Sequence, residues 1–177
     1  MFLSKMLDLP IIDISSGDIV SKTIGWLLRR DCPQLLCLLA RPESWYENAA
    51  YLPFGGITGI SARAVMISSR DQITPLRLHD EIPDYACDCR MGIGSGVYTP
   101  SGDFLGETAD IKIDDRGRIK HLLLGNGSSV SASRILTIGA AFIVSEASSP
   151  LISFAADEGI KIASNISNEI VVRKVQP

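Results

Sequence analysis

The feature that most constrains this chain is a segment that occurs twice within its 177 residues. Residues 16–23 (Ser-Gly-Asp-Ile-Val-Ser-Lys-Thr) align with residues 101–108 (Ser-Gly-Asp-Phe-Leu-Gly-Glu-Thr) at an offset of 85 positions. The alignment continues to the leucine pairs at 38–39 and 123–124. A seven-residue difference in the next loop then lowers the offset to 78, at which residues 57–66 align with 135–144. Matches that keep their order over about 60 residues indicate an internal duplication.

The duplication decides between helix and strand for residues 20–40. Taken alone, that stretch includes leucines at helical spacing. Its counterpart Thr108–Ile113 alternates polar and apolar residues, which is typical of a half-buried strand. Residues 114–117 then form a turn, with Gly117 available for a positive φ, and residues 119–124 return as the second arm of a hairpin. By alignment, residues 23–30 and 35–40 are also strands, turning at Asp31-Cys32-Pro33.

Each copy ends with a polar loop, a short strand of the form Ile-x-x-Ile and one more apolar strand. In the second copy these are residues 130–134, 135–138 and 141–144, with Gly139-Ala140 as the bend. Five or six short strands with tight turns bury their apolar faces economically in a small antiparallel barrel, which also removes exposed strand edges. The sequence therefore predicts an all-β protein of two tandem small antiparallel β-barrels.

The order of glycines, apolar pairs and an Asp-Ile-x-Ile-Asp run resembles the PRC-barrel, a small β-barrel. It is shared by the H subunit of photosynthetic reaction centres and the C-terminal part of the ribosome maturation factor. The residues that carry this resemblance are Gly102, Leu105, Gly106, Asp110, Ile111, Ile113, Asp114, Leu123, Leu124, Ser133, Ile135, Ile138, Gly139, Ile143 and Val144. The first copy departs from the pattern at Ser21, Gly25 and Ser61.

The resemblance implies a PRC-type barrel in residues 1–76, a linker in residues 77–87, and a second PRC-type barrel with a C-terminal extension in residues 88–177. In that extension we expect a helical turn at residues 154–158 and extra strands. Tandem two-barrel proteins of this kind are bacterial, and most have no assigned biochemical activity. The expected function is therefore that of a non-catalytic binding or adaptor protein that mediates protein–protein contacts. A ribosome- or RNA-processing-associated factor is a variant of this reading.

The charge balance argues against direct binding of nucleic acid. Seventeen basic and 20 acidic side chains give a net charge of −3, with no basic footprint. No window approaches the roughly 18 uninterrupted apolar residues of a membrane span, and no signal-peptide pattern opens the chain, so we expect a cytoplasmic protein. The four cysteines are then expected to be reduced thiols. The positive mean hydropathy of +0.21 suits a protein partner or self-association into a homo-oligomer.

The densest set of potential metal ligands is His79, Cys87 and Cys89. Two cysteines on alternate positions of a strand can present thiolates on one face, but structural zinc sites usually separate paired cysteines by about two to four residues, and no second pair exists. The preferred interpretation is a charged linker leading into a strand with small buried cysteines. We therefore predict no metal and no cofactor, and keep these three residues as the alternative metal or small-ligand site.

Two further motifs are better explained by turns than by chemistry. Residues 92–96 (Gly-Ile-Gly-Ser-Gly) resemble a phosphate-binding loop, but such a loop leads into a helix, whereas a strand is predicted here at 97–99. Asp114 and Asp115 lie in the predicted hairpin turn, and Asp18 and Asp103 follow the repeated glycines, where aspartate satisfies backbone groups. Only His79 and His121 can supply an imidazole base, and no nucleophile motif accompanies either. We predict no enzymatic activity.

The longer loop of the first copy carries the most distinctive side chains. Residues 41–51 include Arg41, Trp45, Tyr46 and Tyr51, and arginine with large aromatics are the residue types most often found at interface hot spots. We predict that these four residues contact a protein partner. The alternative is that the loop folds back as a lid on the first barrel.

Overall fold

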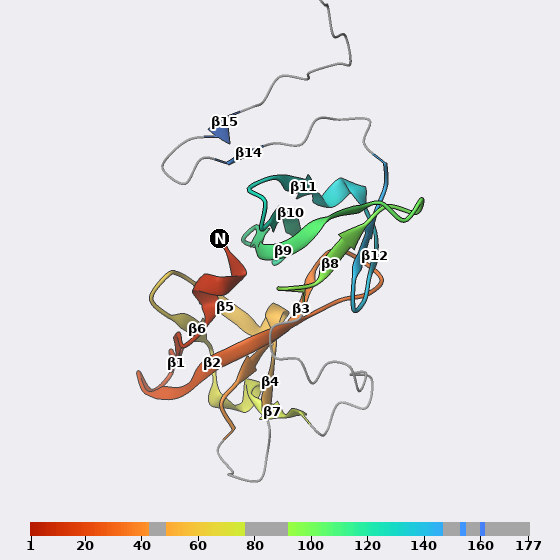
Figure 1. Cartoon of the computed structure of the whole chain (residues 1–177). Helices are drawn as coiled ribbons and strands as arrows, with labels where there is room; N and C mark the ends of the chain where they lie inside the picture. Colours follow the sequence, from red (N-terminus) through yellow and green to blue (C-terminus); the bar gives the residue numbers. More distant parts are fainter. Residues whose placement is uncertain (43–48, 77–91, 147–152, 155–159, 162–177) are drawn as a thin grey trace, which may run out of the picture.

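The computed structural model of the chain describes residues 1–42, 49–76, 92–146, 153–154 and 160–161 (Figure 1). The structure is mostly β: 52% of the described residues lie in strands, and the same residues contain no helix of seven or more residues. The expectation of a β-rich chain is therefore confirmed. The strands form two main sheets, one from each half of the sequence, and a separate two-stranded sheet.

The first sheet has seven strands in the order β5-β6-β1-β2-β3-β4-β7. Their bounds are β1 Pro10–Asp13, β2 Ile19–Leu28, β3 Leu35–Ala40, β4 Ala50–Pro53, β5 Ile57–Ile60, β6 Val65–Ile67 and β7 Thr74–Pro75. Three short 3₁₀ helices accompany it: η1 Leu3–Met6, η2 Phe54–Gly56 and η3 Arg70–Gln72. Neighbouring strands are antiparallel except β1 and β6, which are parallel.

The second sheet has six strands in the order β11-β10-β9-β8-β13-β12. They are β8 Gly96–Tyr98, β9 Phe104–Ile113, β10 Ile119–Leu124, β11 Ser129–Ser131, β12 Ile135–Ile138 and β13 Phe142–Val144, with the 3₁₀ helix η6 Ala132–Arg134 before β12. Here β8 and β13 are the parallel pair. The short strands β14 Ser153–Phe154 and β15 Ile160–Lys161 pair with each other and with no other described strand.

The two sheets repeat one topology. Read from the opposite end, the second sheet has the strand order of β5-β6-β1-β2-β3-β4, and the single parallel pair falls at the same place. Strands β2 and β9 start and end 85 positions apart, while η2 with β5 and η6 with β12 are 78 positions apart. These two offsets match those in the sequence, so the duplication is visible in the structure. Strands β3 and β10, however, start and end 84 positions apart, and β6 and β13 start and end 77 positions apart. The expected alignment is therefore wrong by one residue there: Leu38 and Leu39 correspond to Leu122 and Leu123, and Val65 corresponds to Phe142.

Neither sheet closes into a barrel through strand pairing. Among the described strands, β5 and β7 are the ends of the first sheet, and β12 and β11 the ends of the second. The first sheet nevertheless curls, because the edge strand β5 and the distant strand β3 line the same cavity. A flat sheet would place strands four spacings apart at roughly 19 Å. The expected closed barrels are thus not confirmed; the structure shows two open sheets.

The two copies are joined by their central hairpins and by the N-terminal segment. The Leu35 N–H donates to the Gly117 carbonyl at 2.9 Å, and reciprocally the Ile119 N–H donates to the Pro33 carbonyl at 2.8 Å. At the other side, the Ser4 N–H and hydroxyl donate to the Asp110 carboxylate on β9, at 3.1 and 2.5 Å. Each copy therefore supplies hydrogen-bond partners for backbone groups of the other copy.

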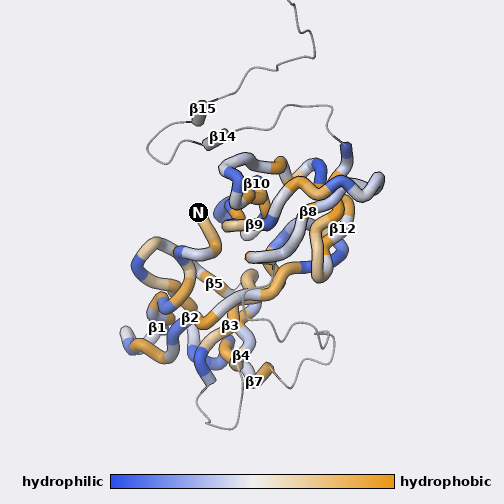
Figure 2. The backbone as a smooth tube through the Cα atoms, viewed as in Figure 1, coloured by the Kyte–Doolittle hydropathy of each residue, from blue (hydrophilic) through white to orange (hydrophobic). Residues whose placement is uncertain are grey.

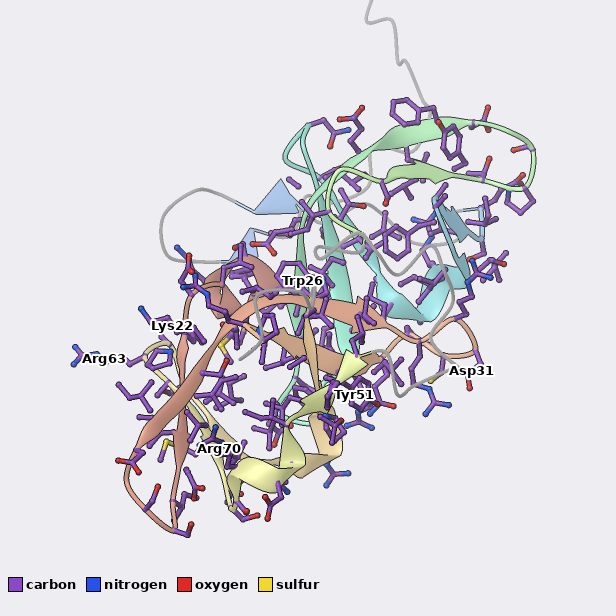
Figure 3. The ribbon with its side chains drawn as sticks, turned by 90° about the horizontal axis from the view of Figure 1, so that it is seen from below. Lys22, Trp26, Asp31, Tyr51, Arg63 and Arg70 are labelled. Atoms are coloured by element: carbon purple, nitrogen blue, oxygen red, sulfur yellow. The ribbon has the colours of Figure 1, made fainter. Side chains whose placement is uncertain are left out.

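One apolar core runs through both sheets. Its fully buried members include Trp26, Leu38 and Ile67 from the first sheet and Ile111 and Phe142 from the second. Figure 3 shows Trp26 in the centre of the molecule, with Asp31 and Arg63 at opposite outer ends. In Figure 2 hydrophobic (orange) stretches of β2 and β3 run through the middle of the molecule.

The predictions of individual elements are confirmed where a turn motif or a polar–apolar alternation marks the element clearly, and are wrong or untested elsewhere. The hairpins of both copies and the bend before β13 are confirmed. The segment 130–134, expected to be a polar loop, instead contains the end of β11 and helix η6. Phe154, expected to start a helical turn, lies in strand β14, and residues 155–158 of that prediction lie outside the described residues. The predicted linker, residues 77–87, also lies outside them.

Candidate functional site

Exposed apolar side chains mark two equivalent places on the surface. Within the described residues, five large hydrophobic side chains are exposed: Ile14, Ile19, Tyr98, Phe104 and Leu136. The first two belong to the end of the β1–β2 hairpin, and the next two belong to the end of the β8–β9 hairpin. Ile19 and Phe104 are the first residues of β2 and β9 and are 64% and 55% exposed, so the duplication places an apolar side chain in solvent at the same position twice.

The β8–β9 hairpin end presents two aromatic rings side by side. Tyr98 lies directly opposite Phe104 in the β8–β9 register, and their ring centroids are 5.1 Å apart at a tilt of 44°. A Cβ on Gly96 would lie 2.6 Å from the Tyr98 ring, so the absence of a side chain at Gly96 lets this ring lie along the strand. Paired aromatic rings of this geometry attract each other, which holds both faces in a defined orientation.

The apolar row continues across the second sheet. Tyr98 lies opposite Ile143 on β13, and Ile143 lies opposite Thr137 on β12, so these side chains share the face of Phe104. Leu136, the residue before Thr137, is exposed at the edge strand. The outward-facing apolar surface formed by Tyr98 and Phe104 is here called the aromatic end.

The β1–β2 hairpin carries the corresponding surface of the first sheet. Ile12 lies opposite Ile19 on β2 and opposite Met66 on β6, and both Ile12 and Met66 are partly exposed. With the exposed Ile14 in the turn, Ile19 and Ile12 form an aliphatic surface that we call the aliphatic end. Figure 1 shows the two hairpin turns projecting from opposite sides of the molecule.

Both hairpin turns are closed by the same backbone bonds. The Asp13 N–H donates to the Asp18 carbonyl at 3.0 Å, and the Thr99 N–H donates to the Asp103 carbonyl at 2.9 Å. Gly17 and Gly102 have φ of 78° and 94°, which favour glycine. Asp18 and Asp103 thus lie at turns, as expected, but it is their backbone carbonyls that close the turns; the Asp103 carboxylate accepts from the Ser101 hydroxyl at 3.1 Å.

The buried carboxylate of Asp13 fixes the aliphatic end to the rest of the sheet. It accepts hydrogen bonds from the Ser15 hydroxyl at 2.6 Å, the Ser15 N–H at 2.8 Å and the Arg70 N–H at 2.9 Å. The hydroxyl bond is the largest influence and lowers the pKa of Asp13; burial opposes this, and the backbone bonds reinforce it. Asp13 therefore stays ionised and links the turn to helix η3.

Of the predicted partner-binding residues, two lie in described parts of the chain. Arg41 follows β3 and is exposed; its N–H donates to the Lys22 carbonyl at 2.8 Å. Tyr51 lies on β4 and packs against a small buried cluster of Leu27, Cys37, Leu39 and Ala49. Trp45 and Tyr46 lie outside the described residues, so the proposal of a four-residue contact loop stays a prediction.

The predicted alternative metal site, His79 with Cys87 and Cys89, lies outside the described residues. In the described part of the chain, no group of three or more His, Cys, Asp or Glu side chains is placed to hold a metal ion. Cys32 and Cys37 are free thiols, and burial raises the pKa of Cys37 to about 12. Cys37 is accordingly a protonated core residue at neutral pH.

The glycine-rich segment before β8 has a structural explanation. Gly92 and Gly94 have φ of 93° and 78°, and strand β8 follows them, as predicted, in place of the helix that a phosphate loop requires. A Cβ on Gly92 would lie 2.8 Å from the Ile111 side chain and 3.1 Å from Leu28. Gly92 therefore allows the chain to cross close over the core that the two copies share.

The described histidine lies on a sheet. His121 is half-buried on β10, opposite Lys112 on β9 and Ser131 on β11. Burial, and then the positive charges of Lys112 and Lys120, lower its pKa, so the imidazole is neutral at pH 7. Ser131, the nearest hydroxyl in register, pairs with Ser133 at 3.0 Å.

The hairpin ends were missed at the level of sequence, although a signal for them exists. In both copies the repeated Ser-Gly-Asp is followed directly by a large apolar residue, Ile19 or Phe104. An apolar residue next to a turn, repeated in both copies at a position where the strand has just begun, is the pattern that identifies them.

No helix within the described residues has the length and apolar character needed to cross a membrane. No protein-family model matches the chain, and no curated protein matches it at a significant level. The likeness to the PRC-barrel consequently stays a resemblance of sequence pattern. What the structure shows is an open sheet whose strand order is repeated in the two halves of the chain.

Proposed function

We propose that this protein is a non-catalytic adaptor that binds protein partners through its two hairpin ends. One observation carries the proposal: four of the five exposed large hydrophobic side chains in the described residues lie at the two equivalent hairpin ends. Large exposed aromatic and aliphatic side chains grouped on one surface are typical of protein-binding sites. The resemblance to the PRC-barrel family, most of whose tandem members have no assigned biochemical activity, supports the same class.

The placement of the two ends supports an adaptor over a single-site binder. The ends project from opposite sides of the molecule, so two partners can be held at once without competing for the same surface (Figure 1). Their chemistry differs, because Tyr98 and Phe104 occupy one end and Ile14 and Ile19 the other. We therefore expect two different partners, or two different segments of one partner.

Substitution at each end tests the proposal. In affinity captures from a lysate of the source cell, quantified by mass spectrometry, Phe104→Ser is expected to lower recovery of one set of proteins by about tenfold, the loss typical of a hot-spot side chain. Ile19→Ser is expected to lower a second set. Both positions are exposed, so the thermal unfolding midpoint should match that of the wild type.

Glu107→Ser, on an exposed position of the same strand as Phe104, is the matched control and should leave both sets unchanged. Undiminished recovery of every partner with both Phe104→Ser and Ile19→Ser would show that the hairpin ends do not bind proteins.

A further inference from the structure

A cavity of about 580 Å³ opens where the first sheet fails to close. It is lined by all four residues of the edge strand β5, by Phe54 and Gly55 of η2, by the start of β3, and by the β9–β10 turn of the second copy. Its volume falls within the range of pockets that bind ligands. It lies apart from both hairpin ends, so an inference about it goes beyond the proposed function.

The cavity exposes a strand edge with free backbone groups. β5 pairs with β6 on one side, and among the described residues no strand pairs with its other side. Sheet edges are usually protected by charged side chains or proline. The other end of this sheet, β7, contains Pro75, whereas β5 reads Ile-Thr-Gly-Ile and carries neither proline nor charge. An open edge inside a cavity is the geometry that accepts an additional strand.

The walls next to this edge are apolar and firmly held. The Phe54 ring lies over Gly117, where an added Cβ would be 2.6 Å from the ring, so the second copy fixes the position of this aromatic wall. Leu36 lines the cavity from β3, and Ile57 lines it from β5 while also packing on the core. Alternate side chains of an incoming strand would meet these walls.

The rim of the cavity favours an acidic occupant. Arg29 and Arg116 line it together with Asp115. The lining thus holds two basic side chains and one acidic side chain, in a chain whose net charge is −3. The Arg29 guanidinium is paired with Asp31 at 2.6 Å, whereas that of Arg116 makes no hydrogen bond or ion pair with any described residue.

We propose that the open edge of β5 binds an extended acidic peptide segment of a partner protein as an additional strand of the first sheet. Backbone hydrogen bonds to β5 supply the pairing, apolar side chains of the peptide pack against Phe54 and Leu36, and its carboxylates approach Arg116 and Arg29. The first sheet thereby gains the strand that its curled edge lacks.

The probe for this site is an eight-residue peptide of alternating valine and glutamate with acetylated and amidated ends. In NMR titrations of the whole chain, the backbone amide signals of Ile57–Ile60 should shift on addition of this peptide. A peptide with two central valines replaced by proline should not shift them, because proline cannot pair along a strand. A peptide with lysine in place of glutamate should bind more weakly. Equal binding of all three peptides would overturn the proposal.

Gly55→Trp fills the cavity directly. A Cβ at Gly55 meets no atom within 4 Å and the position has no positive φ, so the indole can enter the cavity without strain. This variant should lose peptide binding by at least tenfold. Ser133→Trp, at the equivalent exposed position of η6 in the second copy, is the matched control and should bind normally. Arg116→Glu should weaken binding by about fivefold, as expected for a solvent-exposed charge pair.

Two further outcomes are decisive. Phe104→Ser should bind the peptide with the affinity of the wild type. That result shows that the cavity and the aromatic end are separate sites, whether or not the proposed function is correct. If the wild type sediments as a dimer that Gly55→Trp converts to a monomer, a second copy occupies the edge of β5 and the proposal of a partner peptide is wrong. Peptide binding that persists in Gly55→Trp likewise overturns it.

Discussion

Asp114 uses both carboxylate oxygens to close the turn between β9 and β10. One oxygen accepts from the backbone N–H groups of Arg116 at 3.0 Å and Arg118 at 2.9 Å, and the other accepts from the Arg118 Nε at 2.9 Å and lies 3.3 Å from the Lys120 Nζ. Burial alone would raise the pKa of this carboxyl, but the bonds from Arg118, Arg116 and Lys120 outweigh it and lower the pKa to about 2. The turn that meets the first copy therefore depends on a charged carboxylate.

Asp114→Asn should consequently remove a pH-dependent part of the stability. Because the pKa in the folded protein is below the ordinary value of 3.8, the ionised carboxylate stabilises the fold above about pH 4, and this contribution is lost as the pH falls towards 2. We expect a contribution of about 1 kcal/mol once solvent screening is allowed for. Urea unfolding of the wild type and the variant at pH 6 and pH 2.5 measures it, with the exposed Asp115→Asn as control. An equal difference at both pH values would contradict this account.

At the scale of elements, the contact between the two central hairpins joins the copies. The reciprocal bonds from Leu35 to Gly117 and from Ile119 to Pro33 relate the hairpins by an approximate two-fold arrangement, and the Gln34 side-chain amide adds a bond to the Arg116 carbonyl at 3.1 Å. Gly117 serves twice here, because its φ of 73° closes the turn and its bare backbone receives the Phe54 ring.

Gly117→Ala should therefore lower the free energy of unfolding more than a glycine-to-alanine change does at a turn where the added Cβ meets no other atom. Gly127 has a φ of 81° with no atom near its missing Cβ, so Gly127→Ala measures backbone strain alone, about 1 kcal/mol. In Gly117→Ala the methyl group also collides with Phe54 at 2.6 Å, and we expect about 1 kcal/mol more, within the range of overpacking. Chemical denaturation of both variants gives the two free energies of unfolding. Equal losses would mean that Phe54 moves aside without cost.

Over the whole molecule, the shared core couples the halves. Trp26 and Leu38 from the first sheet belong to the same buried cluster as Ile111 and Phe142 from the second, and the Ser4–Asp110 bonds tie the beginning of the chain to β9. Each open sheet thus buries part of its apolar face against residues of the other copy.

We expect the chain to unfold in one cooperative transition. In scanning calorimetry the calorimetric and van't Hoff enthalpies should agree, and circular dichroism and tryptophan fluorescence should give the same midpoint. Two resolved transitions, or midpoints that differ between these probes, would show that the halves are independent.

The sequence contained most of the secondary structure and little of its assembly. Polar–apolar alternation in residues 108–113 identified β9, and the repeat transferred that assignment to β2, whose own leucine spacing suggested a helix. The contact between the copies could not be predicted from the sequence, because it is made by backbone atoms, which are the same in every residue type. The N–H groups of Leu35 and Ile119 donate to the carbonyls of Gly117 and Pro33. The exposed hairpin ends were overlooked because their signal, a large apolar residue directly after the turn in both copies, does not by itself show that Ile19 and Phe104 are exposed; their exposure depends on the path of the neighbouring strands.

The bonds that join the copies connect residues far apart along the chain, Leu35 with Gly117 and Ser4 with Asp110. During synthesis the first hairpin is complete long before the ribosome has made the residues that it pairs with. Until then its outer carbonyl groups and part of the core around Trp26 stay open to solvent or to a chaperone. A high share of such distant contacts slows folding. The duplicated architecture therefore exposes the nascent protein to aggregation for as long as the second copy takes to emerge.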